Sequence, residues 1–147
     1  MASPLIESWL ENCEANHREC GLDLELTLPT RVIAVGAANE DPRLHETQPG
    51  ETGRYAALSH CWGLPGSLTA KTTRANLSQR KQAIPMRDLP TTFSDAIHLS
   101  RALGIPYLWI DSLCIIQDDK ADWNREAECM ADVYGNATLT FSADAAP

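Results

Sequence analysis

Two short polar segments carry most of the side chains that could take part in chemistry. Residues 59–63 hold a serine, a histidine and a cysteine beside a tryptophan and a glycine, and residues 111–118 hold two aspartates, a serine, a cysteine and a glutamine. Each segment follows an apolar run typical of a strand. Because ligands of open α/β sheets bind outside the carboxyl ends of the strands, we predict a ligand pocket where the segments meet. Its candidate residues are Ser59, His60, Trp62, Gly63, Asp111, Cys114, Gln117 and Asp118.

These groups allow nucleophilic hydrolysis in principle, but the sequence argues against it. A nucleophile needs a base within hydrogen-bond reach, and His60 adjoins Ser59 in the sequence but not necessarily in space. The chain has no G-x-S-x-G turn, and Cys114 lies among aliphatic residues, as a buried small hydrophobe does. The sequence leaves two roles open for Asp111. One is to orient a ribose hydroxyl or a loop amide, and the other is to cap the structure that follows its strand.

A metal site and the common nucleotide motifs have little support. Cys13, His17 and Cys20 are spaced so that one helix face could present them to zinc. No C-x-x-C pair or second ligand pair accompanies them, so we interpret them as the core-facing side of a helix and predict no metal. The chain also lacks the phosphate-loop pattern G-x-x-x-x-G-K-S/T and the dinucleotide pattern G-x-G-x-x-G.

The composition is that of an ordinary globular domain. The chain has 147 residues, 44% of them hydrophobic and 22% charged, which suffices for one domain with its own core. A net charge of −8 argues against a general nucleic-acid binder, and no apolar run approaches the roughly 20 residues that cross a bilayer. The start lacks the pattern of a signal peptide, and the five cysteines are an odd number without paired spacing. We therefore expect a cytoplasmic protein with free thiols.

Positive charge gathers in the middle of the chain. Residues 51–106 hold 7 basic and 3 acidic side chains, whereas both flanking parts are acidic. Such a cluster can meet an anionic ligand or an acidic partner, but we favour the plainer interpretation of a solvated helix face. Its members are Lys71, Arg74, Arg80, Lys81 and Arg87.

The elements that must position the candidate groups fall into two parts, of which residues 1–54 are the first. A helix is predicted from Ser3 to Gly21, because a capping residue and a proline open it and a glycine can end it. A short β-prone run predicts a strand over 31–35, and the prolines, glycines and acids of 37–54 predict a surface loop.

Residues 55–147 form the second part, in which strands alternate with helices. Strands are expected at 55–59, 107–110 and 137–141, and helices at 69–83 (or an irregular crossover there), 91–103 and from 119 or 122 to 135. This order implies a parallel sheet with right-handed crossovers.

The last helix has an apolar stripe, and three tryptophans of this part are candidate core aromatics. The stripe is Trp123, Ala127, Met130 and Tyr134, and the tryptophans are Trp62, Trp109 and Trp123.

Several of these segments together resemble one family. Residues 55–63 resemble the first signature block of the fungal heterokaryon incompatibility (HET) domain. Residues 89–97 and 103–118 resemble its second block, which residues 122–140 continue. The resemblance runs over about residues 55–143, in order and at normal spacing. The motif positions that we interpret as structural are Tyr55, Trp109, Trp123, Met130 and Tyr134.

The resemblance implies a fungal intracellular protein of self/non-self recognition. In that family the domain triggers programmed cell death when incompatible hyphae fuse. The partners implied are proteins, through self-association or another incompatibility protein, with no nucleic acid and no membrane span. HET domains are distantly similar to Toll/interleukin-1 receptor (TIR) domains. This similarity implies a flavodoxin/TIR-like α/β fold, a parallel sheet with flanking helices, preceded here by the N-terminal helix.

Some TIR relatives cleave NAD at the nicotinamide–ribose bond with a glutamate, so the resemblance leaves an NAD hydrolase open as the alternative function. HET domains normally carry a third block with a glutamine–glutamate pair, and this chain reaches Pro147 without one. We therefore expect residues 55–147 to be an incomplete HET domain whose catalytic glutamate lies downstream. Glu126 matches a motif position, and we interpret it as structural or pocket-supporting rather than catalytic. The chain alone is predicted not to turn over NAD.

Overall fold

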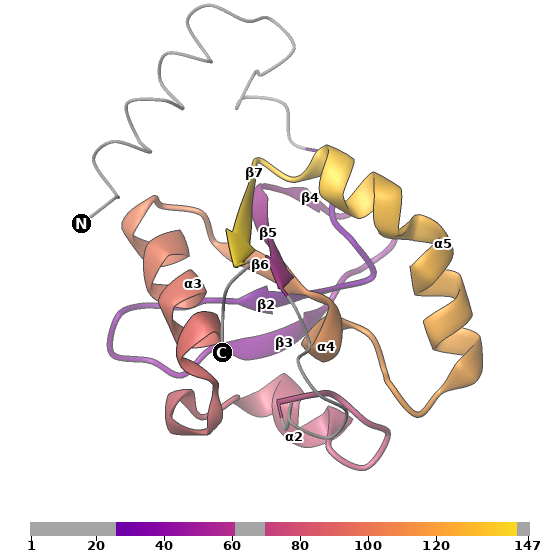
Figure 1. Ribbon diagram of the computed structural model, residues 1–147, viewed down its shortest axis with the longest axis horizontal. Helices are drawn as coiled ribbons and strands as arrows, with labels where there is room; N and C mark the ends of the chain where they lie inside the picture. The colour runs from indigo at the N-terminus through magenta and orange to yellow at the C-terminus, as the bar shows by residue number, and fades with distance from the viewer. Residues whose placement is uncertain (1–25, 61–69, 144–147) are drawn as a thin grey trace, which may run out of the picture.

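The computed structural model describes residues 26–60 and 70–143 as an α/β structure with helices on both sides of a sheet (Figure 1). The strands are β1 (Leu26–Thr27), β2 (Arg31–Ala34), β3 (Arg43–Glu46), β4 (Thr52–Gly53), β5 (Tyr55–His60), β6 (Tyr107–Ile110) and β7 (Leu139–Ala143). The helices are α2 (Leu77–Gln82), α3 (Thr91–Ala102), α4 (Asp111–Cys114) and α5 (Lys120–Asn136), with the 3-10 turn η2 (Met86–Asp88). The helix predicted from Ser3 to Gly21 lies outside the described residues.

The main sheet has five strands in the order β3-β2-β6-β5-β7. Strand β5 pairs in parallel with β6 on one side and with β7 on the other, as the alternation of strands and helices predicts. Strand β2 runs antiparallel to β6 and to β3. The predicted parallel sheet of residues 55–147 is therefore extended into a mixed sheet by β2 and β3, which a short reversal joins instead of a crossover helix.

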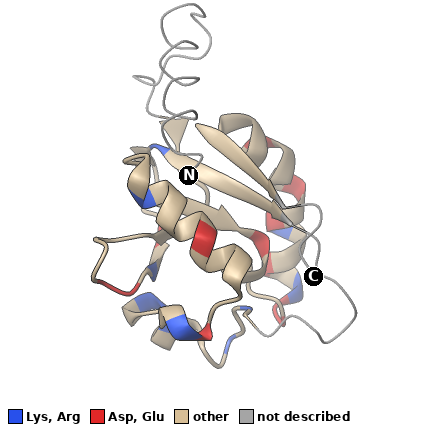
Figure 2. Cartoon of the chain, turned by 60° about the vertical axis from the view of Figure 1, so that its left-hand side comes forward, with Lys and Arg blue, Asp and Glu red and all other residues tan. Residues whose placement is uncertain are grey.

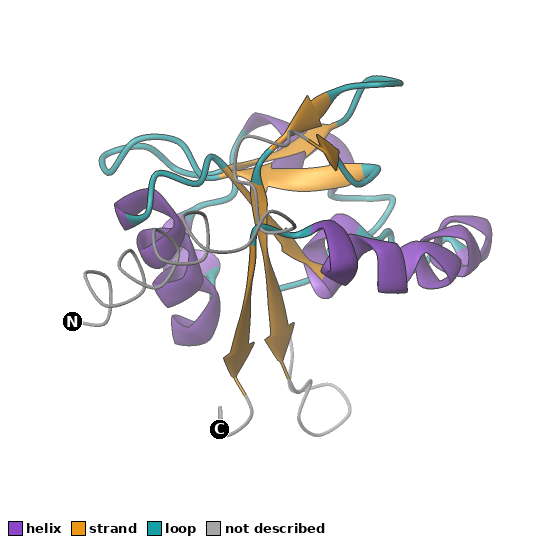
Figure 3. Cartoon of the chain, turned by 90° about the horizontal axis from the view of Figure 1, so that it is seen from above, coloured by secondary structure: helices purple, strands orange, loops and turns teal. Residues whose placement is uncertain are grey.

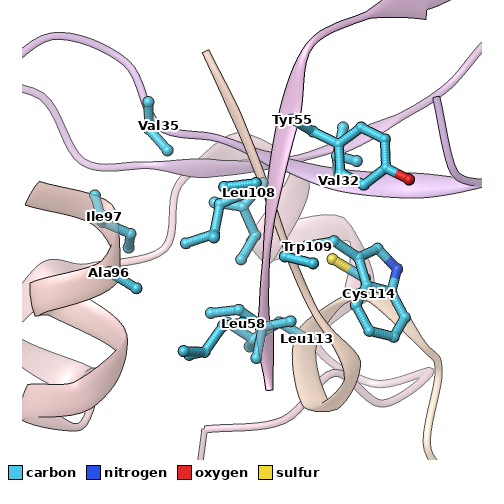
Figure 4. Close-up of a cluster of buried hydrophobic side chains, with 14 of the residues drawn as sticks. Val32, Val35, Tyr55, Leu58, Ala96, Ile97, Leu108, Trp109, Leu113 and Cys114 are labelled. Atoms are coloured by element: carbon cyan, nitrogen blue, oxygen red, sulfur yellow. The ribbon is translucent and has the colours of Figure 1, made fainter. Parts of the chain in front are cut away.

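Helices α3 and α5 lie on opposite sides of the parallel strands, as Figure 3 shows from above. Side chains alternate along a strand, so each face of β5 and β6 meets one helix. On the α3 side, Leu58 and Leu108 face Ile97, and Trp109 lies on the other side of the strands (Figure 4). There its ring meets Tyr134 of α5 edge-on, with centroids 5.5 Å apart. The two helices thus enclose a core on both faces.

Helix α3 follows its predicted pattern closely. Its buried residues are Phe93, Ala96, Ile97 and Ser100, which recur at helical spacing on one face. Burying the three apolar side chains among them contributes roughly 25 cal/mol per Å² of apolar surface removed from water. Gly104, whose φ of +72° lies in the left-handed region that favours glycine, ends the turn that leads into β6.

Helix α5 begins where the sequence predicts, and Met130 and Tyr134 of its predicted stripe pack against the core, but Trp123 faces outward. The carboxylate of Asp119 caps it by accepting the N–H of Asp122. Its buried residues are Asp122, Glu126 and Val133, whereas Trp123 is 49% exposed. The interpretation of Trp123 as a core aromatic is therefore wrong. The physical reason is a cation on the core side: Arg31 of β2 is buried and draws the carboxylate of Asp122 toward the sheet.

Three further segments differ from their predicted form. The predicted surface loop over 37–54 contains β3, which extends the main sheet, and β4, which pairs with β1. The segment 69–83 is helical only over α2, and the polar loop expected after β6 begins with the helical turn α4. Strands β2 and β3, from the part before residue 55, thus share one sheet with β5, β6 and β7. Within the described residues, no helix is long and apolar enough to cross a membrane.

Candidate functional site

A polar group of side chains forms at the carboxyl edge of the parallel strands. In the register of β5 and β6, Leu58 lies opposite Ile110, so the next residues, Ser59 and Asp111, reach the same edge. On the other side of β5, Ser142 of β7 lies opposite Ser59. Both serines are exposed. The edge therefore presents hydroxyl and carboxylate groups from three neighbouring strands.

Tyr134 reaches this edge from helix α5. Burial raises the pKa of Tyr134, the charge of Asp111 raises it further, and a side-chain hydrogen bond with Ser59 opposes the rise. The Tyr134 hydroxyl thus stays protonated at neutral pH beside Ser59 and within electrostatic reach of Asp111. We interpreted Tyr134 as a structural motif residue from the sequence, and the structure brings it to the predicted pocket residues.

The strand order gives this edge a special position. The chain leaves β5 for β6 on one side, and it returns from β6 to β7 on the other. Such a reversal of direction is a topological switch point, where open α/β sheets bind ligands. Ser59 lies beside it at the end of β5.

Hydrogen bonds between side chains and backbone groups hold the segment 111–118. The side-chain amide of Gln117 donates to the carbonyls of Asp111 and Ile115 at 3.0 and 2.9 Å. The carboxylate of Asp118 accepts the backbone N–H of Arg74 at 2.8 Å. Both side chains therefore fix the fold of the loop, and their predicted part in a ligand pocket stays a prediction.

Cys114 is fully buried in the core, as its aliphatic neighbours predict. Burial raises the pKa of the Cys114 thiol to about 12, so the thiolate is not populated at neutral pH. Among the other predicted pocket residues, Trp62 and Gly63 lie outside the described residues, as does the side chain of His60. The described residues of the edge therefore offer hydroxyl and carboxylate groups but no activated nucleophile.

Glu126 lies away from this edge. It is 2% exposed and lines a cleft that also contains Tyr55, the first residue of β5, whereas Ser59 lies near the strand's other end. Within the residues that the structure describes, no group of three or more histidine, cysteine, aspartate or glutamate side chains could hold a metal ion.

A buried ionic cluster between β2 and α5 was not predicted from the sequence. Arg31 is 5% exposed and makes two hydrogen bonds of 3.0 Å to the carboxylate of Asp122. That carboxylate also accepts the backbone N–H of Ile116 at 2.9 Å and a hydrogen bond from Arg125. The signal was an arginine opening an apolar strand, which needs a partner wherever that strand is buried on both faces.

Fold and site together define an α/β protein whose parallel strands, in the order β6-β5-β7, carry a polar edge at the switch point. The family described as "Heterokaryon incompatibility protein (HET)" matches residues 55–147. This match covers more than half of the chain, and the chain belongs to the HET family.

One relative from Neurospora crassa is "Heterokaryon incompatibility protein 6, OR allele". The two sequences are 33% identical over an alignment 89 residues long, which covers 56% of this chain and 13% of the relative. The chain therefore corresponds to a small part of that protein's length. No solved structure matches the chain.

Proposed function

We propose that this chain belongs to a signalling module that triggers programmed cell death when incompatible hyphae fuse. The observation that carries the proposal is the HET match over residues 55–147, which begins at the first residue of β5 and takes in all three parallel strands. The module acts in the cytoplasm through protein partners, by self-association or with another incompatibility protein. The name of the Neurospora crassa relative supports the role in incompatibility.

The test is induced expression in a fungal host, with dye uptake scored in fused and unfused hyphae. We expect cell death with the longest natural protein that contains this chain. Asp111→Ala should reduce that death while the purified variant keeps a cooperative melting transition. Asp95→Ala, at an exposed position on α3, is the matched control and should leave the death response unchanged. No death above the empty-vector level would contradict the proposal.

The alternative function is that of a TIR-like NAD hydrolase. The order of the parallel strands supports this alternative. The arrangement β6-β5-β7 corresponds to the first three strands of a flavodoxin-like sheet, with the switch point beside β5. In this proposal the ribose hydroxyls of NAD bind near Ser59, Asp111 and Tyr134. Water replaces nicotinamide at the ribose carbon, so that nicotinamide and ADP-ribose are released, and the glutamate that assists this step comes from a block downstream of this chain.

Nicotinamide release by purified protein separates the two functions. We expect no steady release from the 147-residue chain and measurable release from a longer protein that carries the downstream block. Release by the chain itself that Glu126→Ala abolishes would move catalysis to Glu126. A longer protein that kills cells without consuming NAD would leave only the signalling function.

A further inference from the structure

The cleft that contains Glu126 lies between helix α5 and the segment that joins β1 to β2, away from the switch point. Its volume is about 210 Å³. One wall comes from α5, and the other comes from the segment before β2 and from β5. The lining residues are Thr27, Leu28, Pro29, Thr30, Tyr55, Glu126, Cys129, Asp132, Val133 and Asn136.

The cleft contains a buried carboxylate that its surroundings leave incompletely paired. Glu126 is 2% exposed, and its Oε1 accepts no hydrogen bond from the described residues. The nearest cation is Arg125, whose Nε lies 3.7 Å from that oxygen and whose side chain is 58% exposed. Asp122, one turn earlier, differs sharply because it accepts hydrogen bonds from both Arg31 and Arg125. A buried carboxylate without such partners is costly, so Glu126 favours a ligand that supplies a charged donor.

The rest of the lining limits the kind of ligand. Leu28 and Val133 are buried and offer apolar contact, whereas Asp132 and Asn136 are exposed. Two carboxylates exclude an anion, and the described residues supply no ligand set for a metal. The volume is below the roughly 300–1,000 Å³ typical of sites for drug-sized molecules, so a nucleotide does not fit.

We propose that this cleft binds an organic cation about the size of an arginine or lysine side chain. Its guanidinium or ammonium group donates to Oε1 of Glu126, and its aliphatic stem packs against Leu28 and Val133. Charge-assisted hydrogen bonds to a buried carboxylate are roughly twice as strong as neutral ones, which gives a small ligand useful affinity. The source of the cation is a basic side chain of a partner protein or a free amine.

Nuclear magnetic resonance titration of the 147-residue chain tests the proposal. The probes are n-butylguanidinium, n-butylammonium, n-butanol and butyrate, and the readout is the amide shifts of Cys129, Val133 and Asn136. We expect saturable shifts with the two cations and none with the alcohol or the anion. This comparison uses the unaltered chain, so it does not depend on a variant that folds.

A peptide distinguishes the two sources of the cation, and a variant tests the role of Glu126. A blocked glycine peptide with one central arginine should bind at least as tightly as butylguanidinium if the partner is a protein, and more weakly if the natural ligand is a free amine. Glu126→Gln keeps the shape of the side chain and should weaken cation binding roughly tenfold or more. Glu128→Gln, exposed on the same helix and outside the cleft, should leave it unchanged. The proposal is wrong if cleft amides do not saturate, if butanol binds equally well, or if Glu126→Gln binds as the unaltered chain does.

Discussion

Arg31 and Asp122 form a buried two-point ion pair that joins strand β2 to helix α5. The two nitrogen–oxygen distances are both 3.0 Å, and the side chains are 6% and 2% exposed. Nη1 of Arg31 also donates to the carbonyl of Cys114 at 3.3 Å, and Asp122 accepts the backbone N–H of Ile116. The pair therefore locks an early strand, the turn after β6 and the start of α5 into one unit.

Removing one partner of this pair should strongly destabilise the fold. Asp122→Ala leaves the Arg31 guanidinium buried without its counter-charge, and breaking a buried pair in this way costs about 3–5 kcal/mol. We expect a loss of this size in the free energy of unfolding, measured by urea denaturation. Glu128→Ala, at an exposed position on the same helix, is the control and should change it by less than about 0.5 kcal/mol.

The double variant Arg31→Met/Asp122→Leu distinguishes the ion pair from packing. Replacing both charges with apolar side chains of similar size removes the desolvation penalty, so this protein should be more stable than Asp122→Ala. An Asp122→Ala variant as stable as the unaltered chain would show that the pair does not hold α5 to β2.

The same carboxylate should make stability depend on acid. Burial raises the pKa of Asp122, but hydrogen bonds from Arg31 and Ile116 and the charges of Arg31 and Arg125 outweigh it. The pKa therefore lies below the ordinary 3.8. A carboxylate with a lowered folded pKa contributes stability above the unfolded value and loses it as the pH falls through the folded one. We expect the stability gap between the unaltered chain and Asp122→Asn to be constant at neutral pH and to shrink below about pH 3.8.

Glu51 offers an internal comparison for that experiment. Hydrogen bonds from the Gln48 N–H and from His45 hold the pKa of Glu51 below the ordinary 4.5. The gap between the unaltered chain and Glu51→Gln should therefore begin to shrink at a higher pH than the Asp122 gap. Gaps that do not change between pH 5 and pH 2 would contradict the assignment for both carboxylates.

Much of the fold was predictable because local signals and tertiary structure agree there. The apolar run at β6, the apolar periodicity of α3 and the Asp119 cap of α5 each specify one structure from nearby residues. Strand β3 was not predictable in this way. Three of its four residues, Arg43, His45 and Glu46, are polar or charged, as suits a sheet edge, and only pairing with β2 makes the segment a strand.

The candidate site was likewise predictable only in part. Topology alone brings Ser59 and Asp111 to one edge, because parallel strands end on the same side. Tyr134 could not be placed there from helical periodicity, which assigns it to the stripe of Trp123. The burial of Asp122 by Arg31 orients α5 with Trp123 exposed, and this contact spans 91 residues of sequence.

The two cysteines among the described residues should react very differently with thiol reagents. Cys114 is fully buried and its pKa is raised to about 12, whereas Cys129 is exposed on α5. Only the thiolate is nucleophilic, so alkylation of the native chain should modify Cys129 and leave Cys114 untouched until the chain unfolds. Peptide mapping by mass spectrometry identifies the modified positions. Rapid labelling of Cys114 under native conditions would mean that the core opens locally far more often than its packing implies.

Stability at high pH should depend on Tyr55. Burial, and then the charge of Asp132, raises the pKa of Tyr55 from 10.0 to about 12, and its hydroxyl donates to the Val133 carbonyl. A group whose folded pKa is raised contributes stability that is present below the unfolded pKa and is lost as the pH rises toward the folded one. The free energy of unfolding should therefore fall between about pH 10 and pH 12.

Tyr55→Phe removes both the titration and the hydrogen bond. At neutral pH it should be less stable by about 1 kcal/mol, because the Val133 carbonyl loses its donor. Across the alkaline range its free energy of unfolding should fall less steeply than that of the unaltered chain. Asp132→Asn removes only the charge that helps to raise the pKa, so phenolate absorbance of Tyr55 should appear at lower pH in that variant. Equal alkaline slopes for Tyr55→Phe and the unaltered chain would rule out Tyr55 as the source of the pH dependence.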